Sequence, residues 1–193
     1  MSALRPRSAR QAGVTLVEMV LTVAVLGAAA LIAVPRSTPV DAIATEAVAA
    51  EIANALRFGQ QEAIRTGRYH VVQIDPATNS LSVFRLTGSG VIARDNGFTV
   101  LHPIDRREFL VGFANNSLPS TTIVGSVFQY SGGATTNSAS FGPDGLPANI
   151  NGTWLNGVPS SRNALLGNGV VTIRHGAAER QVRLDPLTGR VTY

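Results

Sequence analysis

The sequence contains no cysteine and no lysine, and it carries little charge. Without cysteine, the chain has neither a disulfide framework nor a thiol for catalysis. Charged residues make up 15% of its 193 residues, a length and composition that fit one folded domain preceded by a helix. All sixteen basic residues are arginine, which we attribute to genome composition and not to function.

The net charge of +4 does not indicate a nucleic-acid-binding protein. Arg5, Arg7 and Arg10 stand at the very start of the chain, and without them thirteen arginines face twelve acidic residues, a difference of +1. The high isoelectric point reflects the high pKa of arginine and the missing lysines. Composition alone therefore gives no electrostatic footprint for nucleic acid.

The longest apolar run covers residues 14–34, and only Thr15, Glu18 and Thr22 interrupt it. As a helix, these 21 residues would span roughly 32 Å, the thickness of a bilayer core. The three N-terminal arginines, with no acidic residue among them, predict a cytoplasmic N-terminus. The pattern therefore predicts a single membrane span with the rest of the chain outside.

Two other interpretations of this run remain open. A secretory signal peptide has the same charge arrangement, and Ala28-Ala29-Ala30 would serve as its cleavage site. Glu18 argues against it, because a carboxylate within hydrocarbon costs about 3 kcal/mol and is by default a functional candidate. Alternatively, Glu18 only extends toward the lipid headgroups from the cytoplasmic end of the span.

The segment Gly13-Val14-Thr15-Leu16-Val17-Glu18 resembles the processing motif of type IV pilins and type II secretion pseudopilins. The resemblance implies that residues 1–13 are a leader, which a prepilin peptidase removes by cutting after Gly13. Val14 would then be the N-methylated first residue, although the family usually has phenylalanine there. Glu18 would be the fifth residue of the mature chain, and Pro35 would match the helix-bending proline of the family.

This assignment gives Glu18 a physical role in assembly. Cleavage creates an α-amino group on Val14, and Glu18 of a neighbouring subunit can neutralise that cation. A buried charge is tolerated only when it is paired. The rest of the helix is apolar on all sides, which suits lipid before assembly and a filament core afterwards.

A second, amphipathic helix is expected over residues 36–67, after a break at Pro35 and Pro39. Asp41 is the expected N-cap, and Gly67 is the expected stop. Residues 54–65 also resemble the helix of the GspH/FimT-like branch of minor pilins. The face expected to be buried consists of Ile43, Ala47, Val48, Ile52, Ala55, Leu56, Gly59, Ala63 and Ile64.

Residues 68–193 show strand signals and predict a β-sheet domain. Residues 140–145 resemble the Phe-x-Pro-x-Gly turn of the same GspH/FimT-like branch, whereas residues 87–137 have no such support. Residues 149–169 are rich in Asn, Gly, Ser and Pro, and predict an exposed loop around Trp154. The expected strands are 69–74, 81–86, 109–113, 121–130, 138–141, 170–174, 180–184 and 190–193. The expected fold class is α+β and pilin-like: a long N-terminal helix packed on an antiparallel sheet.

No constellation typical of an enzyme is present, and we expect no cofactor and no metal. His70, His102 and His175 lack metal-ligand neighbours at useful spacing, so we interpret them as structural or solvated. The glycine pairs at residues 88–90 and 167–169 lack the lysine and the strand-to-helix context of phosphate loops.

Arginines are concentrated near the C-terminus. Arg174, Arg180, Arg183 and Arg190 share the last twenty residues with only two acidic residues, Glu179 and Asp185. On neighbouring strands they would contact DNA phosphates, as in some FimT-like minor pilins that take up DNA. The alternative, which we favour, is a solvated sheet face with cross-strand charge pairs.

The resemblance therefore implies a minor pilin or pseudopilin near the tip of a type II secretion pseudopilus or a type IV pilus. Its expected partners are other pilins, the prepilin peptidase and methyltransferase, and the bacterial inner membrane, with the C-terminal domain in the periplasm. The alternatives are a DNA-binding minor pilin of a DNA-uptake pilus and a signal-anchored envelope protein that does not assemble.

Overall fold

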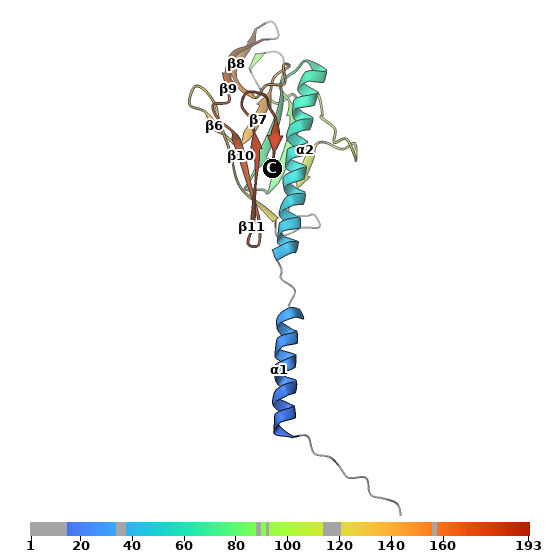
Figure 1. Cartoon of the computed structure of the whole chain (residues 1–193). Helices are drawn as coiled ribbons and strands as arrows, with labels where there is room; N and C mark the ends of the chain where they lie inside the picture. The colour runs from blue at the N-terminus through green and yellow to red at the C-terminus, as the bar shows by residue number, and fades with distance from the viewer. Residues whose placement is uncertain (1–14, 34–37, 88–89, 92, 114–120, 156–157) are drawn as a thin grey trace, which may run out of the picture. The chain divides into compact units, whose positions relative to one another are not determined.

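The computed structural model describes residues 15–33, 38–87, 90–91, 93–113, 121–155 and 158–193 (Figure 1). The chain divides into two compact units, Met1–Ser37 and Thr38–Tyr193, and each has its own architecture. The residues named above that lie outside the described ones are Arg5, Arg7, Arg10, Gly13, Val14 and Pro35.

The first unit contains one helix, α1 (Leu16–Ala33). Between Leu16 and Leu26, where side-chain exposure is described, the large apolar side chains are between 60% and 80% exposed on every side of the helix; they are Leu16, Val17, Met19, Val20, Leu21, Val23, Val25 and Leu26. Within the part of the chain that is described, no helix combines the length and the apolar character of a membrane span.

The second unit begins with α2 (Thr38–Thr66), a helix of 29 residues. The expectation of an N-cap at Asp41 is wrong, because the helix starts at Thr38 and Asp41 lies in its first turn. Pro39 does not prevent this start, since the first turn of a helix needs no backbone N–H there. The expected stop is confirmed: Gly67 follows the helix with a φ of 63°, the left-handed geometry of a C-terminal cap.

The buried face of α2 differs in part from the expected one. Val48, Ile52, Ala55, Leu56, Gly59 and Ala63 are buried as expected, whereas Ile43, Ala47 and Ile64 are exposed. Four residues outside the expected stripe are buried as well: Ala44, Thr45, Ala49 and Ala53. The reason is that α2 contacts two sheets, so that its buried face is wider and includes small side chains that periodicity does not single out.

In the described parts of the second unit, the strands form antiparallel sheets of four, five and three strands. The four-stranded sheet has the order β4 (Leu110–Gly112), β2 (Ser80–Arg85), β1 (His70–Asp75) and β7 (Ser138–Phe141). The five-stranded sheet has the order β12 (Val191–Thr192), β11 (Ala178–Leu184), β10 (Gly169–His175), β5 (Thr121–Gln129) and β6 (Thr135–Thr136). The third sheet has the order β3 (Gly90–Val91), β8 (Ala148–Leu155) and β9 (Val158–Ala164).

The expectation of an exposed loop over residues 149–169 is wrong. Most of this segment belongs to the β8–β9 hairpin, and Trp154 is only 7% exposed. The indole lies edge-on to Tyr69, with ring centroids 5.4 Å apart. Gly152, with a φ of 88°, lies in the irregular part of β8 between Asn151 and Trp154, so that a glycine typical of a turn marks a bulge within a strand.

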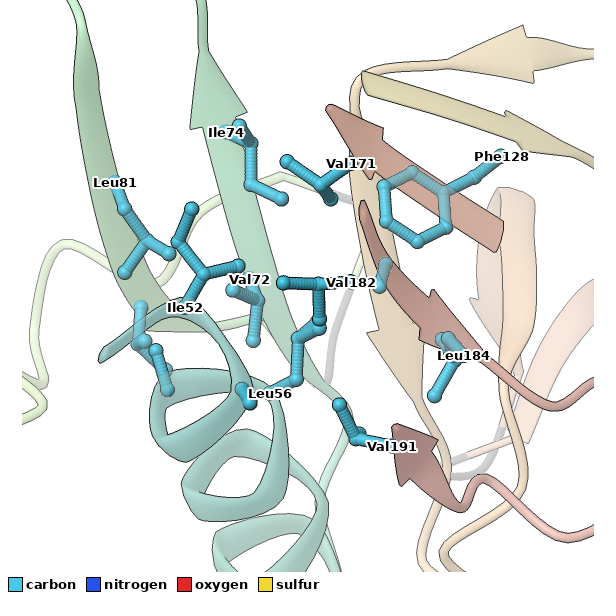
Figure 2. Packing of buried hydrophobic residues seen from close by; sticks show 14 of the residues in the cluster. Ile52, Leu56, Val72, Ile74, Leu81, Phe128, Val171, Val182, Leu184 and Val191 are labelled. Carbon is cyan, nitrogen blue, oxygen red and sulfur yellow. The ribbon is translucent and has the colours of Figure 1, made fainter. Parts of the chain in front are cut away.

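The main core lies where α2 meets the four-stranded and five-stranded sheets. Figure 2 shows Ile52 of α2 beside Leu81 and Val72 of the first sheet, and Leu56 of α2 on the side of Val182 of the second. Gly59 brings the helix close to β1, because a Cβ there would lie 2.6 Å from a methyl group of Val72. A helix packed on antiparallel sheets confirms the expected α+β class.

Candidate functional site

The N-terminal motif is described from Thr15 onward, and Thr15 acts as the N-cap of α1. The backbone N–H of Glu18 donates to the Thr15 carbonyl at 3.0 Å, and the hydroxyl Oγ1 of Thr15 lies 3.4 Å from the same nitrogen. The Thr15–Glu18 spacing is that of a capping box, in which a residue three positions after the cap is acidic. This role of Thr15 was not predicted from the sequence, although the Thr-x-x-Glu pattern indicates a capping box.

Glu18 is the only ionisable side chain of α1, and it lies in the first turn of the helix. A carboxylate at this position interacts favourably with the positive end of the helix dipole, by about 0.3–1 kcal/mol. This local effect accounts for a glutamate at the start of a helix. It does not account for the apolar and exposed side chains that cover the described surface of α1 up to Leu26. Chemically, the arrangement offers one anion at the end of an apolar rod, which suits an ion pair with a cation from another chain.

The structure does not bring the four C-terminal arginines onto one face. Arg174 of β10 pairs with Glu179 of β11, with 2.9 Å between Nη2 and Oε2. Arg180 approaches Glu46 of α2, with Nε 3.3 Å from Oε2. Both pairs are about half exposed and contribute little to stability, but each places a carboxylate beside the guanidinium.

Arg183 and Arg190 are the two members of this group that lie together. They line a shallow pocket of about 190 Å³, which also contains Asn168 and Asp185. Side chains alternate along β11, so that Arg183 points away from the core on the face opposite to Leu184 and Val182, which are buried. One pair of arginines next to a carboxylate is a much smaller basic surface than the four-arginine cluster suggested by the sequence.

The carboxylate of Asp185 accepts hydrogen bonds within its own turn. Its Oδ1 accepts hydrogen bonds from the hydroxyl and the backbone N–H of Thr188, both at 2.8 Å. The Thr188 hydroxyl is the main reason why the pKa of Asp185 is lowered. The carboxylate therefore stays ionised and partly offsets the charge of the nearby Arg190.

His175 joins three elements at the start of α2. Its Nδ1 lies 2.7 Å from the hydroxyl of Thr121, and its Nε2 lies 3.8 Å from Oδ1 of Asp41. A hydroxyl, an imidazole and a carboxylate in sequence resemble a catalytic triad, but Thr121 is completely buried and no substrate can reach its hydroxyl. We interpret the group as a structural tie between α2, β5 and β10.

A second tie involves Gln60 of α2, a residue that sequence reasoning missed. Its side-chain amide donates to the carbonyl of Gly145 at 2.8 Å and to that of Thr188 at 3.3 Å. The first acceptor lies in the turn that resembles the GspH/FimT-like motif, and the second lies in the turn before β12. One glutamine thus joins two turns that are far apart in the sequence, and no pattern along the chain indicates such a contact.

No family model matches the chain, and no curated protein matches it. Solved structures with a similar fold include the minor pseudopilin EpsH from the type 2 secretion system of Vibrio cholerae. EpsH is 12% identical with a TM-score of 0.46, and the alignment covers 77% of this chain and 94% of EpsH. The type IV minor pilin FimU of Pseudomonas aeruginosa is 14% identical in two crystal forms, with TM-scores of 0.41 and 0.39. These alignments cover 77% and 76% of this chain, and 86% and 90% of FimU.

Both proteins are of the class that residues 13–18 resemble. The identities of 12–14% concern the fold alone, and at these TM-scores the likeness does not argue for a function. The functional argument depends on the N-terminal residues themselves.

Proposed function

We propose that this chain is a minor pilin or pseudopilin, a non-enzymatic subunit of a type II secretion pseudopilus or a type IV pilus. The observation that carries the proposal is α1: an exposed apolar helix whose single charge, Glu18, lies in its first turn, at the fifth position after Gly13. An exposed apolar surface of this extent needs lipid or protein around it. A filament subunit uses both in succession.

The proposal has three steps. A prepilin peptidase removes residues 1–13, and the new N-terminus at Val14 is methylated. Residues 14–35 form a transmembrane segment that anchors the chain in the bacterial inner membrane, with the second unit in the periplasm. This step rests on the apolar run of residues 14–34 in the sequence, because α1 alone does not meet the requirements of a span. Glu18 then pairs with the α-amino group of a neighbouring subunit as the chain enters the filament, near its tip.

The test is a comparison of two variants, Glu18→Ala and Gly13→Val, in cells that assemble the filament. We expect Glu18→Ala to be cleaved normally but to enter filaments at least about tenfold less, because it leaves a buried α-amino group unpaired. We expect Gly13→Val to keep its leader, because the peptidase requires a small residue before the cut. N-terminal sequencing of the mature chain and immunoblotting of purified filaments measure the two effects.

Glu18→Gln is the matched control, since it keeps the shape of the side chain and removes only its charge. Wild-type incorporation of both Glu18 variants would contradict the pairing role. A mature chain that begins elsewhere than at Val14 would contradict the processing step and would favour a signal peptide or a simple anchor.

A further inference from the structure

A groove lies beside α2, between the helix and the segment 98–106. It has a volume of about 430 Å³, within the range of roughly 300–1,000 Å³ that is typical of ligand sites. Its apolar lining includes Phe58 of α2 and, from the segment, Phe98, Val100 and Leu101. We call it the α2 groove. Neither the capping of α1 nor the contacts that tie the sheets to α2 involve it.

The walls of the α2 groove are held in place by contacts outside it. Phe109 packs against Phe58 and against the ring of His102, with centroids 5.1 Å and 4.7 Å apart. The guanidinium of Arg85 lies 3.8 Å above the ring of Phe98 and is itself fixed by an ion pair of 2.5 Å with Asp95. A site formed before its ligand arrives loses less conformational entropy on binding.

The charged residues around the α2 groove differ in whether another side chain pairs with them. Glu62 and Arg65 neutralise each other through two hydrogen bonds of 2.9 Å and 2.6 Å. Arg106 also lines the groove, and its side chain makes no ion pair or hydrogen bond with any of the described residues. Two carboxylates next to the groove face His102 and not Arg106: Oδ1 of Asp105 lies 3.4 Å from Nδ1 and accepts from the backbone N–H of Arg107 at 3.2 Å, and Oε1 of Glu51 lies 3.8 Å from Nε2.

The backbone of Arg106 is also unusual. Its φ of 58° is in the left-handed region, which costs an arginine about 1–2 kcal/mol. A hydrogen bond of 3.1 Å from its N–H to the carbonyl of His102 holds it there, as does one of 2.8 Å between His102 and Arg107. A strained residue that presents an unpaired charge at an apolar groove is a reason to look for a ligand.

We propose that the α2 groove binds a short segment of another protein chain in which a large apolar side chain stands next to a carboxylate. The apolar side chain lies on Phe58 and Leu101, and the carboxylate forms an ion pair with Arg106. The charge selects this partner: the guanidinium of Arg106, which has no partner within the described parts of the chain, lies beside an apolar floor and matches one carboxylate, whereas a nucleic acid needs a row of cations along its phosphates. The inference does not depend on the proposed role in a filament.

The test measures peptide binding to the full-length chain in lipid nanodiscs. Because the chain has no cysteine, Ile104→Cys gives a single attachment point for a fluorophore; Ile104 is 86% exposed and does not line the groove. The probe is an acetylated and amidated tetrapeptide of sequence Phe-Asp-Leu-Asn, which carries one carboxylate. Its neutral analogue is Phe-Asn-Leu-Asn.

We expect the acidic peptide to bind at least about tenfold more tightly than the neutral one. Arg106→Gln should abolish this preference, and Arg106→Lys should keep part of it. Arg107→Gln is the matched control, because this neighbouring arginine is exposed but does not line the groove. Leu101→Ala should weaken the binding of both peptides by a similar factor, since it removes part of the apolar surface of the groove.

Three results would overturn the proposal. They are the absence of saturable binding up to millimolar peptide, equal affinities for the two peptides, and equal effects of Arg106→Gln and Arg107→Gln. Circular dichroism of each variant shows whether the fold is kept. None of these outcomes bears on Glu18, so that a failure here and a failure of the filament proposal remain distinguishable.

Discussion

At the scale of single residues, the buried histidine of β1 has the clearest chemical consequence. His70 is completely buried, with Nδ1 3.1 Å from the carbonyl of Arg68 and with no partner for Nε2 among the described residues. Burial is the main cause of its lowered pKa; Glu62 raises that pKa, whereas Arg85 and Arg65 lower it. The native state therefore keeps His70 neutral at a pH where an exposed histidine is protonated.

The sign of the effect on stability follows from this difference. The unfolded chain binds a proton at His70 near pH 6.5, and the native state binds it only at a lower pH. The contribution to stability is therefore complete above about pH 6.5 and is lost as the pH falls. We expect the free energy of unfolding to decrease between pH 7 and pH 5, and His70→Phe to make this dependence shallower. Urea titrations at both pH values measure it.

The control for this prediction is Gln73→Ala, which changes an exposed side chain of the same strand that does not titrate and leaves His70 in place. It should keep the wild-type slope between pH 7 and pH 5. If His70→Phe and the wild type lose the same free energy of unfolding over this interval, His70 is not responsible for the pH dependence of stability.

At the scale of elements, the packing of α2 on β1 depends on Gly59. Replacing a helix glycine by alanine normally stabilises by about 1 kcal/mol. Here the added Cβ would lie 2.6 Å from Cγ2 of Val72, a fully buried side chain, and such overpacking costs about 1–3 kcal/mol. We expect Gly59→Ala to destabilise the protein by about 1 kcal/mol, as measured by urea unfolding.

The matched variant is Gly59→Ala combined with Val72→Ala, which removes the methyl group that the new Cβ would meet. The pair should be less destabilised than the sum of the two single variants, because the clash exists only when both side chains are present. Strict additivity, or a stabilised Gly59→Ala, would mean that the helix does not lie as close to β1 as the geometry requires.

Elements with a clear local signal could be predicted from the sequence. The hairpin of β1 and β2 and the meander of β10 and β11 follow from alternating apolar residues separated by turns such as 75–79. The β8–β9 hairpin could not be predicted, because its glycine forms a bulge and its Asn and Ser residues lie in paired strands. Burial of Trp154 and Tyr69 against each other stabilises this hairpin, and such a contact over 85 positions leaves no local pattern.

The candidate site likewise has residues that the sequence predicts and contacts that it does not. Glu18 follows from the motif, because a lone carboxylate in an apolar run is a local feature. The α2 groove and the ties of Gln60 and His175 are contacts between distant segments, and residue spacing does not encode them. For the arginines, the sequence showed their number near the C-terminus but not their partners: Glu46, which pairs with Arg180, precedes it by more than a hundred residues.

At the scale of the whole second unit, polar contacts join the C-terminal meander to α2 along most of the helix. The pairs run from His175 with Asp41, through Arg180 with Glu46, to Arg57, whose Nη2 donates to the carbonyl of Val191 at 3.1 Å. Arg180 and Arg57 thus connect the five-stranded sheet to α2. This use of the charges leaves few of them for a polyanion.

The last prediction concerns DNA, and it is negative. Arg174 and Arg180 lie beside carboxylates, so that of these four arginines only Arg183 and Arg190 share an open pocket among the described residues. Two phosphate contacts give a salt slope of about −1.8, whereas typical DNA-binding proteins make six to ten contacts and have a steeper slope. We therefore expect no shift of a double-stranded DNA fragment by the full-length chain at 150 mM salt. We also expect no difference between the wild type and the Arg183→Gln, Arg190→Gln double variant, whose control is Arg68→Gln at an exposed arginine away from this pocket. Binding by the wild type that the double variant alone abolishes would establish the pocket of Arg183 and Arg190 as a phosphate site and would favour a role in DNA uptake over a purely structural one.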